Sequence, residues 1–421
     1  MSAAPAQHGS ARIGALAAAD DDPHLKRMTD SREQSQAIAR PAVLRVDLSD
    51  FRGYAALRLG FDDRPVVLTG PNGAGKTNLL EAISFLAPGR GLRRVRLAEI
   101  DRRPGAGPWA VAATVQTPKG PVRIGTGRDA RSESGERRLL RIDGARPRSQ
   151  AALAEHVHLV WLTPQMDRLF LEGGGARRRF LDRLVLGFDP GHGARLAAFE
   201  RTMRERARLL QEGPADPSWL KALEEGMAAD AIAIAAARRE VVARLDQACA
   251  AASSGAFPRP RLALEGPIDA WLAAMPALAA EEELRRRLAA ERRIDAERGT
   301  ASIGPHRSDL VVHHAGSGRA AAQCSTGEQK ALLVAIILAY ARLRAAVTGT
   351  PPILLLDEVA AHLDGERRAA LLQEIATLGG QSWLTGTEPT LFAALDGAAQ
   401  FFAISDAAVL AAGASKGTAT L

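Results

Sequence analysis

Alternating apolar and polar residues mark the first patterned part of the chain. Residues 43–48 and 57–61 alternate with a period of two, which is typical of half-buried strands. Turn residues separate three further segments of this kind, at 109–115, 122–125 and 139–142. The pattern therefore predicts an antiparallel sheet in the first half of the chain.

Continuous apolar runs indicate a second kind of sheet. Residues 65–69, 157–162 and 353–356 are almost entirely apolar, as fully buried strands are. In the last third of the chain, such strands, including 382–384 and 401–404, alternate with helical segments. This alternation predicts a parallel α/β sheet.

Residues 191–298 have another character, because helix formers dominate and apolar residues recur at helical spacing. We expect an inserted helical arm with breaks near 213–214 and around 253–260. The heptad repeat of a long coiled coil does not persist there. The sheet is expected to resume at 308–312, before a segment at 331–339 that is apolar on nearly every face and predicts a buried helix.

The predicted fold class is α/β: a head with an antiparallel β subdomain and an inserted helical arm. Met28 lies just before the patterned part of the chain and is a candidate translation start. The expected division is a disordered N-terminal tail (1–40), a first head lobe (41–190), the helical arm (191–300) and a second head lobe (301–421).

The charge balance suits a polyanionic partner such as nucleic acid, since 55 Lys and Arg face 48 Asp and Glu and the pI is about 10.0. The two cysteines, Cys249 and Cys324, are far apart, which argues against a disulfide framework or a thiolate metal site. The sequence lacks both an apolar run of the ~20 residues that span a bilayer and the basic-then-apolar layout of a secretion signal. We expect a cytoplasmic protein.

The most specific motif follows the apolar run at 65–69. Residues 70–77 fit G-x-x-x-x-G-K-[ST], with a strand expected before and a helix after, so a chance glycine-rich turn is a poor alternative. Glycines let backbone N–H groups point at a polyphosphate, while Lys76 reaches its terminal phosphates and the Thr77 hydroxyl ligates Mg²⁺. The residues expected to bind nucleotide here are Gly70, Asn72, Gly73, Gly75, Lys76, Thr77 and Asn78.

Two acids follow the apolar run at 353–356, where the carboxyl end of a strand binds ligands in open α/β sheets. Asp357 is predicted to hold Mg²⁺, directly or through water. Glu358 is predicted to polarise an attacking water, which makes it, with Lys76, a catalytic candidate. A plain strand end is the alternative when these acids are taken alone.

Residues 325–329, Ser-Thr-Gly-Glu-Gln, begin the predicted buried helix and form a second potential anion site. The glycine-rich loop at 70–77, called the P-loop, is expected to bind the phosphates of one nucleotide. The second anion site would therefore bind a nucleotide held by a second molecule. It resembles the signature motif of ABC-type ATPases, in which two heads dimerise around two ATP molecules. A simple helix cap with Glu328 in a capping role is the alternative.

Together the motifs resemble the RecF family of bacterial recombination and repair proteins, which is related to the heads of SMC proteins. The resemblance covers almost everything after residue 43, in the family's order. Its most specific part is Gly304-Pro305-His306-Arg307, which transporter ATPases do not share. The matching stretches are 48–54, 70–83, 177–182, 304–310, 325–332 and 355–358.

The resemblance implies roles for further residues. Ser325 and Gly327 would contact the γ-phosphate across a dimer, and Gln165 would link the metal to the lobe interface as a catalytic and metal-binding residue. Asp364 would lie in the segment that crosses between subunits, and Arg52 near the base or phosphates.

The sequence departs from the family at Gln165, where an acid is usual, and at Ala361, where a serine is usual. Many transporter ATPases have a histidine at the switch position, which senses the γ-phosphate. In this sequence the position falls in residues 383–387 and a threonine takes its place; Thr385 and Thr387 are both candidates.

The family's function implies a slow, DNA-dependent ATPase that forms ATP-dependent homodimers and binds single-stranded or gapped DNA and junctions. It would promote RecA loading with RecO and RecR in recombinational repair and the SOS response. The alternatives are a membrane-transporter ATPase, which places its signature soon after the P-loop, and an SMC-like structural ATPase, which needs long heptad arms. The candidate DNA contacts are Arg93, Arg94, Arg96, Arg177, Arg178 and Arg179.

Overall fold

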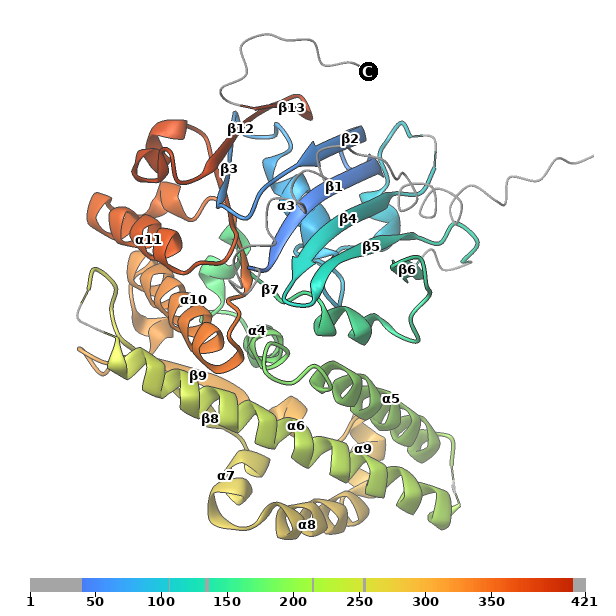
Figure 1. Ribbon diagram of the computed structural model, residues 1–421. Helices are drawn as coiled ribbons and strands as arrows, with labels where there is room; N and C mark the ends of the chain where they lie inside the picture. Colours follow the sequence, from blue (N-terminus) through green and yellow to red (C-terminus); the bar gives the residue numbers. More distant parts are fainter. Residues whose placement is uncertain (1–39, 106, 133–135, 214–215, 253–254, 412–421) are drawn as a thin grey trace, which may run out of the picture. The chain divides into compact units, whose positions relative to one another are not determined.

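The computed structural model describes residues 40–105, 107–132, 136–213, 216–252 and 255–411 (Figure 1). The expected tail before residue 40 and the candidate start at Met28 lie outside these residues. The chain forms two compact units. We call residues 1–164 with 345–421 the head unit and residues 165–344 the arm unit.

An antiparallel sheet of five strands forms one layer of the head unit, in the order β2-β1-β4-β5-β6. It confirms the sheet predicted from period-two alternation. β1 pairs with β4 through the register Leu48↔Val111, and both of these residues are buried. The strands are β1 Ala42–Phe51, β2 Tyr54–Gly60, β4 Ala110–Thr117, β5 Gly120–Arg128 and β6 Arg138–Ile142.

The second sheet of the head unit has the order β13-β12-β3-β11-β10-β7. Its neighbours from β12 to β7 run parallel, as the apolar runs predicted, and β13 adds an antiparallel edge that the pattern did not indicate. The strands are β3 Val66–Thr69, β7 Leu159–Leu162, β10 Ile353–Leu356, β11 Ser382–Gly386, β12 Gln400–Ser405 and β13 Ala408–Ala411.

Helix α3 (Lys76–Ser84) contacts β1 of the antiparallel sheet and β11 of the parallel sheet. Residues 79–84 are all buried, because both sheets cover the helix. The P-loop helix is therefore held from two sides. The other helices of the head unit are α11 Gly365–Thr377 and the short 3-10 helices η1 Leu97–Ile100, η2 Gln150–Glu155, η6 Ala360–His362 and η7 Pro389–Leu395.

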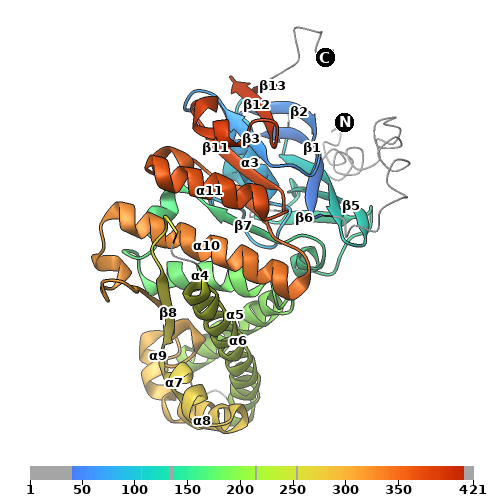
Figure 2. The ribbon, with the colours of Figure 1, turned by 60° about the vertical axis from the view of Figure 1, so that its left-hand side comes forward.

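The arm unit is built on α6 (Pro217–Ala251), which packs along α5 (His192–Gln211) (Figures 1 and 2). Its core includes Phe199, Ala231 and Leu284, all buried. The other helices are η3 Pro164–Arg168, α4 Gly174–Val185, α7 Pro267–Ala274, α8 Ala277–Ala290, α9 Arg292–Arg298, η4 Pro305–Arg307, η5 Ala321–Gln323 and α10 Thr326–Thr348.

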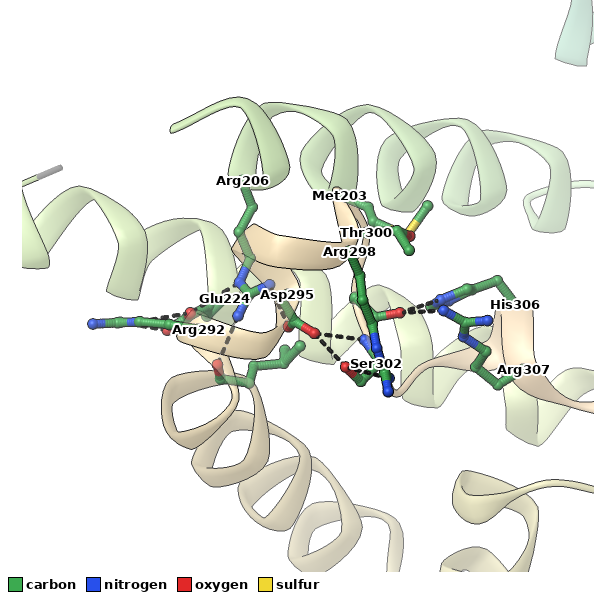
Figure 3. Close-up of polar contacts among 12 residues, drawn as sticks. Met203, Arg206, Glu224, Arg292, Asp295, Arg298, Thr300, Ser302, His306 and Arg307 are labelled. Atoms are coloured by element: carbon green, nitrogen blue, oxygen red, sulfur yellow. Dashed lines mark hydrogen bonds and ion pairs between the residues drawn. The ribbon is translucent and has the colours of Figure 1, made fainter. Parts of the chain in front are cut away.

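A buried ionic network ties the arm helices together (Figure 3). Arg206 of α5 donates to Glu224 of α6 (2.9 Å), to Asp295 of α9 (2.7 Å) and to the carbonyl of Leu288 in α8 (2.6 Å). Its side chain is 1% exposed. Because a buried charge is tolerated only when it is paired, the network fixes these four helices in one arrangement.

The structure differs from the expectation at residues 308–312. These residues start β9 (Asp309–His314), which pairs with β8 (Pro260–Glu265) in a separate two-stranded sheet of the arm unit instead of continuing a head sheet. β8 begins at Pro260, where the expected break at 253–260 ends, and otherwise lies in residues expected to belong to the helical arm. Its short exposed alternation carries too little apolar signal to predict a strand.

The two compact units divide the chain at other residues than the expected first lobe (41–190), arm (191–300) and second lobe (301–421). Residues 165–190 and 301–344 belong to the arm unit. In α10, Tyr340 donates a hydrogen bond to the Leu184 carbonyl of α4 (2.9 Å), which links these segments. α10 is the one described helix long and apolar enough to cross a membrane, but most of its residues from 329 to 341 are buried, as the pattern predicted for a core helix.

Candidate nucleotide-binding site

The P-loop runs from β3 into α3, as predicted, and two of its glycines are required by close contacts. Gly70 has φ 144°, and a Cβ there would lie 2.0 Å from the Ile404 carbonyl oxygen. Gly75 has φ 114°, and its Cβ would lie 2.8 Å from the Tyr54 hydroxyl. Only glycine allows both the left-handed backbone and these approaches.

Tyr54, the first residue of β2, supports the loop from the antiparallel sheet. Its hydroxyl donates to the Gly75 carbonyl at 3.1 Å. Burial raises the pKa of Tyr54 to about 12, so the phenol remains a donor at neutral pH. Sequence reasoning missed this role, because a tyrosine in an alternating strand carries no signal of what its hydroxyl contacts.

Lys76 is buried at the start of α3, and its Nζ donates to the carbonyls of Gly70 (2.7 Å) and Pro71 (2.9 Å). Burial lowers the pKa of Lys76, while the charges of Glu358 and Asp357 oppose that shift. The ammonium group thus lies inside the loop, where the charges of both predicted acids act on it. A polyphosphate in the loop would offer it stronger acceptors than the two carbonyls.

Asp357 follows β10 and is 3% exposed. Its Oδ1 accepts hydrogen bonds from the hydroxyls of Thr77 (2.9 Å) and Thr385 (2.8 Å). Burial raises the pKa of Asp357, and these two hydrogen bonds partly offset that effect. The structure therefore brings together two of the three predicted magnesium ligands, Thr77 and Asp357, which are 280 residues apart in the sequence.

Glu358, half-buried, has a left-handed backbone with φ 54°. This conformation is costly for a residue other than glycine and persists only where its surroundings enforce it. Its N–H donates to the Thr385 hydroxyl at 2.8 Å. The backbone thereby turns the Glu358 side chain away from the course that a continuing strand would give it.

Arg52 is held by protein groups at the P-loop helix. It binds both carboxylate oxygens of buried Glu81 at 2.9 Å and donates to the Glu99 carbonyl at 2.9 Å. Arg93 also binds Glu81 and contacts Asn78 Oδ1, each at 2.9 Å. Arg93, a predicted DNA contact, thus binds two side chains of helix α3. A contact of Arg52 with the nucleotide stays a prediction.

The signature segment lies in the arm unit, where Ser325 precedes α10. The Ser325 N–H and hydroxyl both bind Glu328 (2.8 and 2.9 Å), and the Glu328 N–H returns a bond to the hydroxyl (3.3 Å). This reciprocal cap is the alternative foreseen from the sequence. Ser325 and Gly327 are nevertheless exposed, and a Cβ at Gly327 would meet no atom within 4 Å. The capped helix start thus remains accessible to a phosphate.

Three further predicted residues are exposed. Gln165 lies in η3 at the start of the arm unit, and its role at the metal stays a prediction. Asp364 caps α11 by accepting from the Arg367 N–H (2.8 Å), and Ala361 lies just before it in η6. Their contacts to a second subunit are likewise predictions.

Comparisons with known proteins show the family of this chain. The RecF/RecN/SMC N terminal domain model matches residues 42–402. A DNA replication and repair protein RecF from Rhizobium etli (strain CIAT 652) is 50% identical over 366 residues, which cover 87% of this chain and 97% of that protein. The chain belongs to the RecF family. Its relative from Rhizobium meliloti (strain 1021) is 49% identical over the same shares of both chains.

Solved structures support the fold of this RecF-family chain. The structure of the recombination mediator protein RecF-ATP in the RecFOR pathway has a TM-score of 0.78 at 21% identity and covers 90% of this chain and 100% of that chain. An Smc head domain from Pyrococcus furiosus has a TM-score of 0.51 at 16% identity, covering 88% and 96%. The family and fold are those of a DNA replication and repair protein with an SMC-type ATPase head, which removes the transporter alternative.

Two of the segments that match the family, 177–182 and 304–310, bind each other in the arm unit. Arg177 pairs with Asp309 (2.6 Å), and Arg178 donates to the Ser308 carbonyl (2.7 Å). Asp182 accepts a hydrogen bond from Arg238 (2.7 Å), and Arg238 also donates to the Pro305 carbonyl. Two of the arginines predicted as DNA contacts therefore hold the arm unit together. Of the six candidates, Arg94, Arg96 and Arg179 are exposed.

The residues of the head unit fit a magnesium nucleotide. Thr77 and Asp357 present oxygen ligands, which Mg²⁺ prefers, and their oxygens already converge. Lys76 and the backbone N–H groups of the loop supply the positive groups that a triphosphate requires. Mg²⁺ bound there would neutralise phosphate charge, and Lys76 would orient the terminal phosphates.

Proposed function

We propose that this protein is an ATP-dependent DNA clamp of recombinational repair, acting in the cytoplasm. Each head binds ATP and Mg²⁺ at the P-loop, and two copies close around two nucleotides. The homodimer binds single-stranded or gapped DNA and junctions, and slow, DNA-dependent hydrolysis limits its lifetime. It promotes RecA loading together with RecO and RecR and so contributes to the SOS response.

One observation carries the proposal: the nucleotide groups are divided between the two compact units. Lys76, Thr77 and Asp357 meet in the head unit, whereas Ser325 and Gly327 form an exposed helix start in the arm unit. A helix start attracts anions through its free N–H groups and its dipole. A second copy that offers this helix start to the γ-phosphate would couple nucleotide binding to dimerisation.

The RecF relatives support the DNA part of the proposal, as does the net charge of +7. Contacts between arginines and phosphates release counterions, so binding weakens as salt is added. We assign such contacts to Arg94, Arg96 and Arg179, because these three arginines are exposed, whereas Arg93, Arg177 and Arg178 are half-buried.

The deciding experiment is sedimentation of the full chain with ATP and Mg²⁺, with and without gapped DNA. We expect a monomer without nucleotide, a dimer with ATP, and a dimer–DNA complex when both ligands are present. A wild-type profile that ATP does not change would refute the clamp.

Two variants separate binding from turnover. Lys76→Ala removes the phosphate-binding cation and should abolish nucleotide binding and dimerisation, whereas Lys119→Ala, at an exposed lysine, should behave as wild type. Glu358→Gln should bind ATP but hydrolyse it about 100-fold more slowly, within the range of general-base catalysis, and should trap the dimer on DNA. Glu388→Gln is the matched exposed control. Normal turnover by Glu358→Gln would assign water activation to another group.

A further inference from the structure

We infer that Thr385 is a positioning residue that sets both acids of the site, resting on the proposed binding of magnesium ATP. The sheet order places β11 between β3, which leads to the P-loop, and β10, which leads to Asp357. In the register, Leu384 pairs with Leu356, and Thr385 pairs with Leu68. The Thr385 hydroxyl therefore lies between the two strands that carry the nucleotide groups.

A single hydroxyl group contacts both acids. Thr385 Oγ1 donates its proton to Asp357 Oδ1 at 2.8 Å and accepts the N–H of Glu358 at 2.8 Å. The side chain is 0% exposed, so water does not compete for either bond. A hydroxyl can donate one hydrogen bond, and Asp357 accepts the one that Thr385 donates. The Thr385 hydroxyl therefore has no second proton to donate to another group.

The first bond selects which oxygen of Asp357 is left for a cation. Oδ1 accepts from both Thr77 and Thr385, and among the hydrogen bonds of the described residues none uses Oδ2. Thr385 thus fixes the rotation of the carboxylate and leaves Oδ2 available as a ligand. The Thr77 hydroxyl alone would allow the carboxylate to turn about that single contact.

The second bond fixes the backbone at Glu358. Its φ of 54° belongs to the left-handed region, which side chains other than glycine avoid. The bond from its N–H to Thr385 holds that conformation and so sets the direction of the side chain that is proposed to polarise water. Loss of the hydroxyl would release the metal-binding acid and the catalytic candidate together.

Thr387, the other threonine considered for the switch position, has a different environment. It is exposed in the bend after β11. Since the Thr385 hydroxyl is committed to the acids, we assign any contact to the γ-phosphate from this segment to Thr387. The two threonines therefore make separable predictions.

The test compares Thr385→Val, which keeps the shape and removes the hydroxyl, with Thr385→Ser, which keeps the hydroxyl, and with Thr387→Val. Binding of a fluorescent ATP analogue is titrated with Mg²⁺ and, separately, in EDTA. For Thr385→Val we expect the Mg²⁺ concentration for half-maximal binding to rise about tenfold, with unchanged affinity in EDTA. Thr385→Ser should keep the wild-type Mg²⁺ dependence within about threefold, by the same energy scale. Thr387→Val, which removes the contact assigned to the γ-phosphate, should instead weaken nucleotide binding equally with Mg²⁺ and in EDTA.

Hydrolysis gives a second readout. Thr385→Val should lower kcat by about tenfold or more at saturating Mg²⁺, because Glu358 is also released, and Thr385→Ser should restore most of it. A Thr385→Val protein with wild-type Mg²⁺ dependence and kcat would overturn the inference. An equal loss of Mg²⁺ dependence and kcat in Thr385→Ser would also overturn the inference, since the methyl group and not the hydroxyl would then be responsible. If the valine variant does not fold, the serine variant decides the question. If wild-type protein fails to bind magnesium ATP, the proposed function fails instead.

Discussion

Replacing Arg206 by methionine tests the ionic network that joins the arm helices. The change keeps a long apolar side chain but removes the cation that binds Glu224, Asp295 and the Leu288 carbonyl. All three charged side chains are at most 4% exposed. The carboxylates left behind would remain buried without their shared partner.

The size of the effect follows from what each carboxylate retains. Glu224 keeps Arg292, which binds it at 2.6 Å, so its charge stays compensated. Within the described part of the chain, Asp295 keeps only the N–H and hydroxyl of Ser302 (2.8 and 2.5 Å). Breaking a buried pair on one side costs about 3–5 kcal/mol. Because one of the two acids stays paired, we expect about 3 kcal/mol, at the lower end of that range.

The assay is urea unfolding combined with hydrogen exchange of the α6 and α9 peptides, which localises the loss to the arm unit. Arg206→Met with Asp295→Asn should recover part of the stability, since the unpaired charge is then gone. Arg293→Met breaks an exposed pair with Glu297 and should cost less than about 0.5 kcal/mol. If Arg206→Met costs no more than this control, the network does not stabilise the arm in the way described.

Two further predictions concern the family-specific segments of the arm unit. Burial lowers the pKa of His306 below its usual 6.5, so the folded state binds a proton at this residue less readily than the unfolded state does. The free energy of unfolding should therefore fall as the pH drops below about 6.5, by up to about 1.4 kcal/mol per pH unit. Urea midpoints at pH 7.5 and 5.5 test this, and His306→Gln should reduce the difference; an unaltered pH dependence in that variant would assign it to other groups. Arg177→Gln should lower the melting temperature by removing the pair with Asp309, whereas Arg179→Gln should leave stability within about 0.5 kcal/mol and reduce the salt dependence of DNA binding. Equal effects of both changes on stability would contradict the distinction.

Much of the head could be predicted because its signals are local. The P-loop is a run of eight residues whose glycines set the backbone, and the apolar runs at 66–69 and 353–356 form the strands on either side of β11. The strand β8 could not be predicted, since its alternation is brief and mostly exposed. The same limit applied to the arginines at 177 and 178, because a basic run looks alike whether it faces solvent or binds Asp309 and the Ser308 carbonyl.

The sequence alone determined that the chain has a P-loop motif, two acids after a buried strand and a Ser-Thr-Gly-Glu-Gln segment at the start of a buried helix, since each depends on neighbouring residues. Only the tertiary structure decided that Thr385 joins the two acids and that Tyr54 supports Gly75. Those contacts depend on which strands lie next to each other, and the order β3-β11-β10 differs from the order along the chain. A hydrogen bond requires its atoms within about 3 Å of one another, and that proximity is a property of the folded sheet.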